Sequence, residues 1–144
     1  MVERVETGPG VTRVRVVADH AALAAYFDEN PPTSADGTAG RLVIPLGSFG
    51  GPVALDGCAV RVTSAFPSGW TLGMYAGADI ASADLVSGPY PAAADTTGQV
   101  VTIQPMNGLA YASGVAFFLV LAKQGETAPP AAGALSLHAE LHTA

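Results

Sequence analysis

Charged side chains are scarce in this sequence. Asp, Glu, Lys and Arg make up 12% of its 144 residues, about half the share found in ordinary globular domains. The net charge is −6, Lys123 is the single lysine, and the six basic residues form no run. The concentrated positive charge that nucleic-acid binding requires is therefore missing, and we exclude that class of function.

Cysteine is almost absent. Cys58 stands alone, which excludes an internal disulfide and any metal site built from several cysteines. Its neighbours Ala59 and Val60 are apolar, so we predict that the thiol belongs to the core and is not a reactive group. Disorder is not expected either, because 49% of the residues are hydrophobic and disordered chains combine low hydrophobicity with high charge.

Long hydrophobic runs are also lacking. The most hydrophobic one is Val115–Ala122, far short of the roughly 20 residues of a membrane-spanning helix. Bounded by Gly114 and Gly125, it is typical of a strand buried on both faces. We predict a central strand, paired on at least one side with the last strand, and no membrane association. The start MVERVETGPG has no apolar stretch, so we expect no secretory signal and folding in a cytoplasm.

Short β-strand patterns fill most of the chain. Val11–Val17 alternates Arg13 and Arg15 with valines, and the segment ALSLHAEL at 134–141 alternates apolar and polar residues strictly. Alternation with a period of two indicates a strand with one face on the core and one face in solvent. Both segments are therefore expected to lie in a sheet with one solvated side.

Two further signals set local structure between these strands. RLVIPLG begins a strand at Arg41, in which Pro45 requires an edge position or a bulge because proline has no N–H to donate. Asp19 can cap a short helix that runs toward Phe27, although the same residues also fit an irregular edge.

These patterns define a fold class. About eight short strands, with no helix long enough for a parallel crossover, predict an all-β fold: a single antiparallel β-sandwich, jelly-roll-like. A chain of this length suits one domain. We expect the sandwich domain over 11–144, preceded over 1–10 by a short extended N-terminal arm that is disordered in isolation and orders on binding a partner.

One cluster of possible metal ligands occurs near the end of the chain. His138, Glu140 and His142 fall two residues apart and share one face of the last predicted strand. Neighbours in this row lie about 7 Å apart and can chelate one metal in pairs, but the two imidazoles are about 13 Å apart, so a complete site needs another ligand. The alternative is a solvated outer strand face without metal, which we favour.

Patterns typical of catalysis are missing. The sequence has no GxSxG motif, and Cys58 has no histidine at a recognisable spacing. Glycines such as Gly47 and Gly51 lack the lysine and the following helix of a phosphate-binding loop. We therefore expect no enzymatic activity and no cofactor.

Aromatic residues give an alternative function. A sandwich face with exposed Trp and Tyr can stack on sugar rings, so a carbohydrate-binding module that uses Trp70 and Tyr75 to hold a glycan remains open. Trp70 follows the turn FPSG and begins an apolar strand. That position favours a core or subunit-contact residue over a sugar platform.

The chain as a whole resembles the small β-sandwich head-decoration, or cement, proteins of tailed bacteriophages that infect high-GC bacteria. The features that carry the resemblance are the extended start MVERVETGPG, one sandwich from Val11 onward, low charge, and few Lys, Asn and Ile residues among many Ala, Gly, Val and Pro. The resemblance implies a non-enzymatic virion protein that is made in the host cytoplasm and binds the major capsid protein to stabilise the shell. A tail or fibre component of the same virion would look similar.

Self-association is expected from the low charge. A monomer with so few charged residues leaves apolar, Ala-rich and Gly-rich surface exposed, and other copies would cover it. We expect a homo-oligomer, and a homotrimer rather than a dimer because decoration proteins of this kind tend to sit at three-fold positions. Tyr90, between Pro89 and Pro91 in the loop 87–95, is expected to act as a rigid apolar contact residue.

Overall fold

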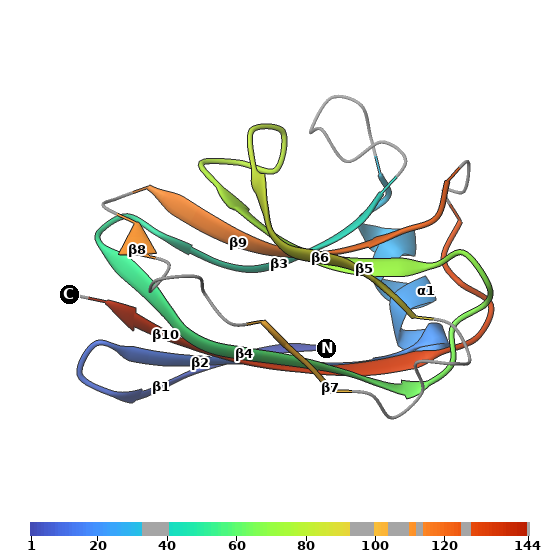
Figure 1. Ribbon diagram of the computed structural model, residues 1–144, viewed down its shortest axis with the longest axis horizontal. Coiled ribbons are helices and arrows are strands. Elements are labelled where there is room, and N and C mark those ends of the chain that lie inside the picture. Colours follow the sequence, from blue (N-terminus) through green and yellow to red (C-terminus); the bar gives the residue numbers. More distant parts are fainter. Residues whose placement is uncertain (33–40, 93–99, 104–109, 112–113, 125–127, 144) are drawn as a thin grey trace.

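Two antiparallel sheets pack face to face in the computed structural model, which describes residues 1–32, 41–92, 100–103, 110–111, 114–124 and 128–143 (Figure 1). The first sheet has the order β1 (Val2–Gly8), β2 (Val11–Asp19), β10 (Ala134–Thr143), β4 (Val53–Ser64), β7 (Val100–Ile103), and β8 (Ala110–Tyr111) also pairs with β4. The second sheet has the order β3 (Leu42–Phe49), β9 (Val115–Ala122), β5 (Thr71–Gly77), β6 (Asp84–Pro91). The predicted all-β sandwich is confirmed.

The strand order is that of a jelly roll. Strands β2, β10, β4 and β7 face strands β3, β9, β5 and β6, and β2 to β3, β3 to β4 and β4 to β5 each cross from one sheet to the other. A double-sheet jelly roll interleaves eight strands in this way. Strands β1 and β8 are additions at the margins of the larger sheet.

Strand β9 is the centre of the smaller sheet, between β3 and β5. Seven of its eight residues are buried, so the predicted burial on both faces is confirmed. The predicted pairing with the last strand is wrong, because β10 lies in the other sheet between β2 and β4. The continuous apolar run of β9 fits a sheet that is covered on both faces. The alternation of β10 fits a sheet with one face in solvent. The two patterns therefore belong to different sheets.

The N-terminal segment differs from the expected arm. Val2–Gly8 is extended, but it forms strand β1 and pairs with β2 from Val2 opposite Val16 to Gly8 opposite Val11. Gly10 makes the turn with a φ of 73°, and its carbonyl accepts a hydrogen bond of 2.7 Å from the Thr143 amide. The segment is ordered by β2 within the chain itself, and the boundary expected at residue 10 falls in a hairpin turn.

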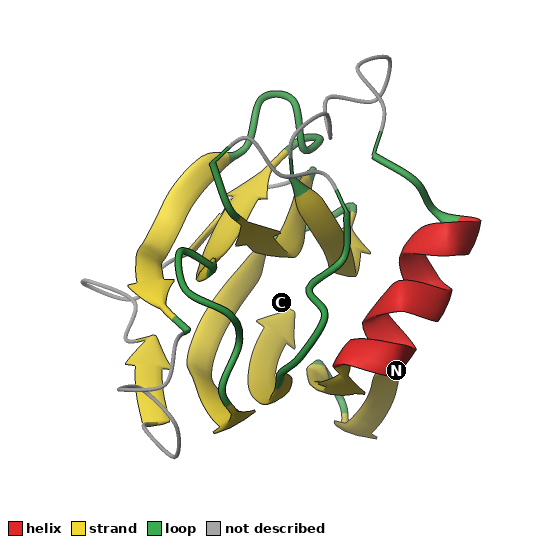
Figure 2. Cartoon of the chain, turned by 90° about the vertical axis from the view of Figure 1, so that its right-hand side faces the viewer, coloured by secondary structure: helices red, strands yellow, loops and turns green. Residues whose placement is uncertain are grey.

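The helix α1 (His20–Glu29) follows β2 directly and stands at one side of the sandwich (Figure 2). The Asp19 side chain accepts a hydrogen bond of 2.8 Å from the Ala22 amide, so the predicted N-cap is confirmed. Leu23 and Phe27 anchor the helix in the core. Nowhere in the described part of the chain is a helix both long and apolar enough to cross a membrane.

Pro45 occupies an edge strand and a bulge at once. Strand β3 is the outer strand of the smaller sheet, and its pairing with β9 shifts between Pro45 and Gly47. Both alternatives expected for this proline are therefore realised. The bulge leaves Leu46 out of the ladder.

Two hydrophobic clusters lie on the two faces of the smaller sheet. The main core lies between the sheets, with alternate residues of β9 such as Phe117 and Leu119 facing β2, β10 and β4. The second cluster lies on the opposite face of the smaller sheet, where Phe118 and Val120 pack with Ile80 from the β5–β6 connection. This second cluster explains why β9 needs no polar side.

Candidate interaction surfaces

The His138, Glu140 and His142 row lies on the outer face of β10, as the alternation predicts, while Leu137, Ala139 and Leu141 are buried beneath it. Strand β10 is central in its sheet, so this face has neighbours on both sides. A glutamate in this position can form an ion pair with a residue of the adjacent strand and a hydrogen bond with a residue of its own strand.

Glu140 is held in this way. Its Oε1 lies 2.9 Å from His142 Nε2, and its Oε2 lies 3.5 Å from Arg13 Nε on β2. The hydrogen bond with His142 and the charge of Arg13 hold the pKa of the Glu140 carboxyl below its ordinary value. Across the described ranges, no group of three or more His, Cys, Asp or Glu side chains is placed to hold a metal ion. The contacts of Glu140 are those of an ion-paired surface.

The two single residues singled out by the sequence are both buried. Cys58 faces the core opposite Ala139, and burial raises the pKa of its thiol to about 12. Trp70 is 3% exposed. The predicted core position of Cys58 is confirmed. For Trp70 the sequence left a core position and a subunit contact open, and the structure shows the core position, so its indole is exposed neither to a sugar ring nor to another subunit.

Tyr75 and Tyr90 belong to the smaller sheet. Tyr75 is half-buried on β5, with the Arg41 guanidinium 5.6 Å from its ring centre. Tyr90 pairs with Leu72 at the end of β6 and packs against the main core. The loop expected over 87–95 is therefore wrong for 87–91, which belongs to β6, and residues 93–95 lie outside the described part of the chain.

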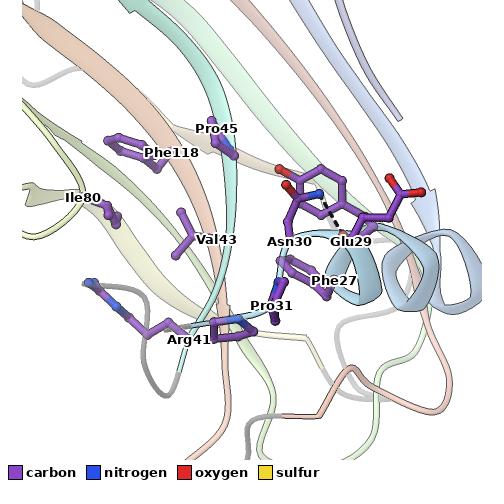
Figure 3. Close-up of a pocket in the computed structure, with 11 residues that line it drawn as sticks. Phe27, Glu29, Asn30, Pro31, Arg41, Val43, Pro45, Ile80 and Phe118 are labelled. Atoms are coloured by element: carbon purple, nitrogen blue, oxygen red, sulfur yellow. Dashed lines mark hydrogen bonds between the residues drawn. The ribbon is translucent and has the colours of Figure 1, made fainter. Parts of the chain in front are cut away.

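A cavity of about 440 Å³ lies between α1 and the outer side of the smaller sheet (Figure 3). Phe27 approaches from the helix, Val43 and Phe118 approach from the sheet, and Ile80 approaches from the β5–β6 connection. Its polar groups are partly engaged within the chain, as Asn30 Nδ2 donates to the Tyr26 carbonyl at 2.9 Å. The cavity is mainly an apolar recess under the end of the helix.

Three exposed apolar side chains lie on the outer face of the β1–β2 hairpin, Met1 beside Val17 and Val5 further along β1 beyond Glu3. Met1, Val5 and Val17 are 37%, 49% and 49% exposed, and they are three of the four exposed large hydrophobic residues in the described ranges, the fourth being Leu85. Met1 lies opposite Val17, whose amide donates to the Met1 carbonyl at 3.2 Å. We call these three residues the hairpin patch.

A hollow of about 390 Å³ adjoins this patch. It is lined by Met1, Val2 and Val17, with Glu3 and Arg15 as its charged residues. An apolar centre with charged residues at its rim is the arrangement found in protein–protein interfaces. Sequence reasoning missed this surface because it treated 1–10 as an arm, although the turn residues Gly8, Pro9 and Gly10 between valine-rich segments are a hairpin signal.

A second hollow, of about 240 Å³, lies further across the same face. It is lined by residues of three adjacent strands: Arg15 from β2, Ser136, Leu137 and His138 from β10, and Ala59 and Arg61 from β4. We call it the arginine hollow. The sequence gives no hint of it, because its two arginines are 46 residues apart.

Comparisons with known proteins give no family. No protein-family model matches the sequence, and no curated protein matches it. Among solved structures, a chain of "Structure of infectious bursal disease virus Gx strain" superposes with a TM-score of 0.38 and 13% identity, over 97% of this chain and 40% of that chain. The chain thus spans less than half of that neighbour, and a likeness of this degree assigns neither a family nor a function.

Proposed function

We propose that this chain is a non-enzymatic structural protein of a virion, a head-decoration protein that binds the major capsid protein and associates with copies of itself. The single observation that carries the proposal is the hairpin patch on an edge strand. Strand β1 has β2 as its neighbour on one side and ends the sheet on the other. An open edge beside exposed apolar side chains favours strand addition from another chain.

The backbone of β1 is arranged for such pairing. The Met1 carbonyl accepts from Val17, so the odd-numbered residues of β1 direct their polar backbone groups toward β2. In an antiparallel ladder the direction alternates. Val2, Arg4 and Glu6 therefore direct their N–H and C=O groups to the open edge.

The charges of β1 favour a second copy of this chain as the partner that pairs with its open edge. Antiparallel pairing of two β1 strands about Val5 places Arg4 of each copy opposite Glu6 of the other, with the Arg4 guanidinium still hydrogen-bonded to the Leu46 and Pro45 carbonyls of its own chain. Centring the pair on Glu3, Arg4 or Glu6 places like charges opposite one another, which is destabilising. The Val5 register also brings the two exposed Val5 side chains together.

This contact has two-fold symmetry, because one edge pairs with itself. A dimer is then the expected unit, whereas the sequence-based expectation was a homotrimer. The molecular mass in solution distinguishes the two. On a capsid, the two subunits of such a dimer would each make a weak contact. Once one contact has formed, the second is intramolecular, so the dimer binds more tightly than either subunit alone.

Virion structure is favoured over the carbohydrate alternative by the position of Trp70. Jelly rolls serve both viral capsid and lectin domains, so the fold by itself leaves both open. The sugar-binding proposal needs Trp70 at the surface, and this residue is 3% exposed. The resemblance to phage decoration proteins supports the virion role, with assembly in the host cytoplasm and final location on the capsid surface.

Light scattering on the purified chain tests self-association. The wild type is expected at twice the monomer mass of 14.4 kDa, and Val5→Asp is expected as a monomer because it places two carboxylates opposite each other. Leu85→Asp is the matched control, since Leu85 is also exposed, at 43%, but lies on β6. A wild-type monomer, or a Val5→Asp variant that stays dimeric, overturns the β1 contact.

Location is tested separately. Immunogold labelling with an antibody against the chain should decorate the heads of intact virions of the virus that encodes it, and the chain should copurify with those particles. Labelling confined to tails moves the protein to the tail, and its absence from purified particles overturns the virion role.

A further inference from the structure

The arginine hollow is a second candidate binding site on the surface of the molecule, apart from the hairpin patch. We propose that it binds a tetrahedral oxyanion group, a phosphate or sulfate ester, between Arg15 and Arg61. This site is independent of the β1 contact and of the virion role.

The pairing register builds the hollow. His138 lies opposite both Arg15 and Ala59, and Ser136 lies opposite both Val17 and Arg61. Arg15, Arg61, Ser136 and His138 project from the outer face as polar groups around the small Ala59. The floor is therefore Ser136 and His138 on β10, with one arginine on each side in a diagonal arrangement.

Small Ala59 opens the space between the two arginines. A larger side chain at this position would stand directly beside His138, on the side from which Arg61 reaches over the floor. The hydroxyl of Ser136 and a ring N–H of His138 can both donate hydrogen bonds. Four donor groups from three strands thus border one hollow of about 240 Å³.

The charges of the two arginines in the hollow have no ion-pair partner among the described residues. Neither Arg15 nor Arg61 makes an ion pair with a described carboxylate, in contrast to Arg13 one row away, which pairs with Glu140. Glu3 lies opposite Arg15 across the β1–β2 ladder without an ion pair to it. In a chain of net charge −6, two of six basic residues therefore meet at one hollow with their charge available.

The donors define the ligand class. Guanidinium groups present several N–H donors in a plane and match phosphate and sulfate oxygens in paired hydrogen bonds. The lining includes no Phe, Tyr or Trp, and its one ring, the His138 imidazole, is placed in the floor as a hydrogen-bond donor. The recognised unit is the oxyanion group itself, carried by a small molecule or by a modified side chain or sugar.

Titration of the full-length protein with phenyl phosphate and, separately, phenyl sulfate tests the site by amide chemical shifts. We expect saturable shifts centred on Ser136 and His138, with a dissociation constant of about 1 mM or tighter at low salt, weakened by added KCl. The relative affinity of the two esters distinguishes a phosphate source from a sulfate source.

Matched double variants make the test specific. Arg15→Gln with Arg61→Gln should weaken binding tenfold or more, whereas Arg13→Gln with Arg41→Gln removes the same charge elsewhere and should leave the affinity within about twofold. Equal losses in both variants, or no saturable shift in the wild type, overturn the site. The Val5→Asp variant should bind the ester like the wild type, so failure of the β1 contact and failure of this site are told apart.

Discussion

Arg4 on β1 donates from Nε to the carbonyl oxygen of Leu46 on β3, and so joins the two sheets at their open margin. Leu46 is the residue that the β3 bulge leaves out of the ladder with β9. Its carbonyl would otherwise lack a ladder partner, which is costly for a partly buried group. Arg4 Nη2 also donates to the Pro45 carbonyl at 3.3 Å. A proline-induced bulge and an inward-facing arginine are therefore parts of one contact.

Arg4→Ala should lower the free energy of unfolding by about 1 kcal/mol, because the Leu46 carbonyl loses its donor while water replaces part of the contact. The change is measured by urea denaturation in the Val5→Asp background, which removes any contribution from self-association. Arg61→Ala is the control, since it makes no such contact, and it should change little. Equal stability of the two variants contradicts a role for Arg4 in joining the sheets.

Gly133→Ala should destabilise the fold by about 2 to 4 kcal/mol. Gly133 has a φ of 118°, and a Cβ at this position would lie 2.5 Å from Cδ1 of the buried Phe66 ring. Both the backbone and the ring would have to shift. Thermal melts of the variant and the wild type measure the loss. Gly50→Ala, where a Cβ meets nothing within 4 Å, is the control and should stay within about 0.5 kcal/mol of wild type.

Cys58 should resist thiol reagents in the folded protein. Burial raises its pKa to about 12, so at pH 8 almost no thiolate forms, and the thiolate is the reactive species. We expect labelling with Ellman's reagent only after denaturant is added, in step with unfolding measured by circular dichroism. Rapid labelling of the native protein would show that the thiol is accessible.

Acid should weaken the fold partly through Glu140. Its pKa lies below the ordinary value of 4.5 in the folded protein, first because of the His142 hydrogen bond and also because of Arg13. A carboxyl with a lowered folded pKa stabilises the protein above its unfolded pKa, and this contribution is lost as the pH falls through the folded pKa.

Thermal melts from pH 6 downward measure this loss. Glu140→Gln should flatten the decline in melting temperature below pH 4.5, relative to Glu29→Gln on the helix, which carries the same charge change. If both variants lose stability along the wild-type curve, the Glu140 ion pairs do not contribute.

Much of the fold could be predicted from local patterns. The alternation in 11–17 and 134–141, the run Val115–Ala122, the Asp19 cap and the Pro45 bulge each report how a segment meets core and solvent, and each appears in the structure as expected. Burial of Cys58 and Trp70 followed from their apolar neighbours. Periodicity is informative here because a strand presents alternate residues to opposite faces.

What the sequence by itself determined was therefore the class of the protein: an all-β sandwich with few charges and a buried central strand. Only the tertiary structure decided which strands are neighbours. It placed β10 beside β2 and β4 instead of β9, turned the N-terminal segment into an edge strand, and brought Arg15 and Arg61 to one hollow. Periodicity along a strand reports which side chains are buried but not which strand lies alongside, because pairing depends on how both sheets close around a shared core, through contacts between residues far apart in the chain.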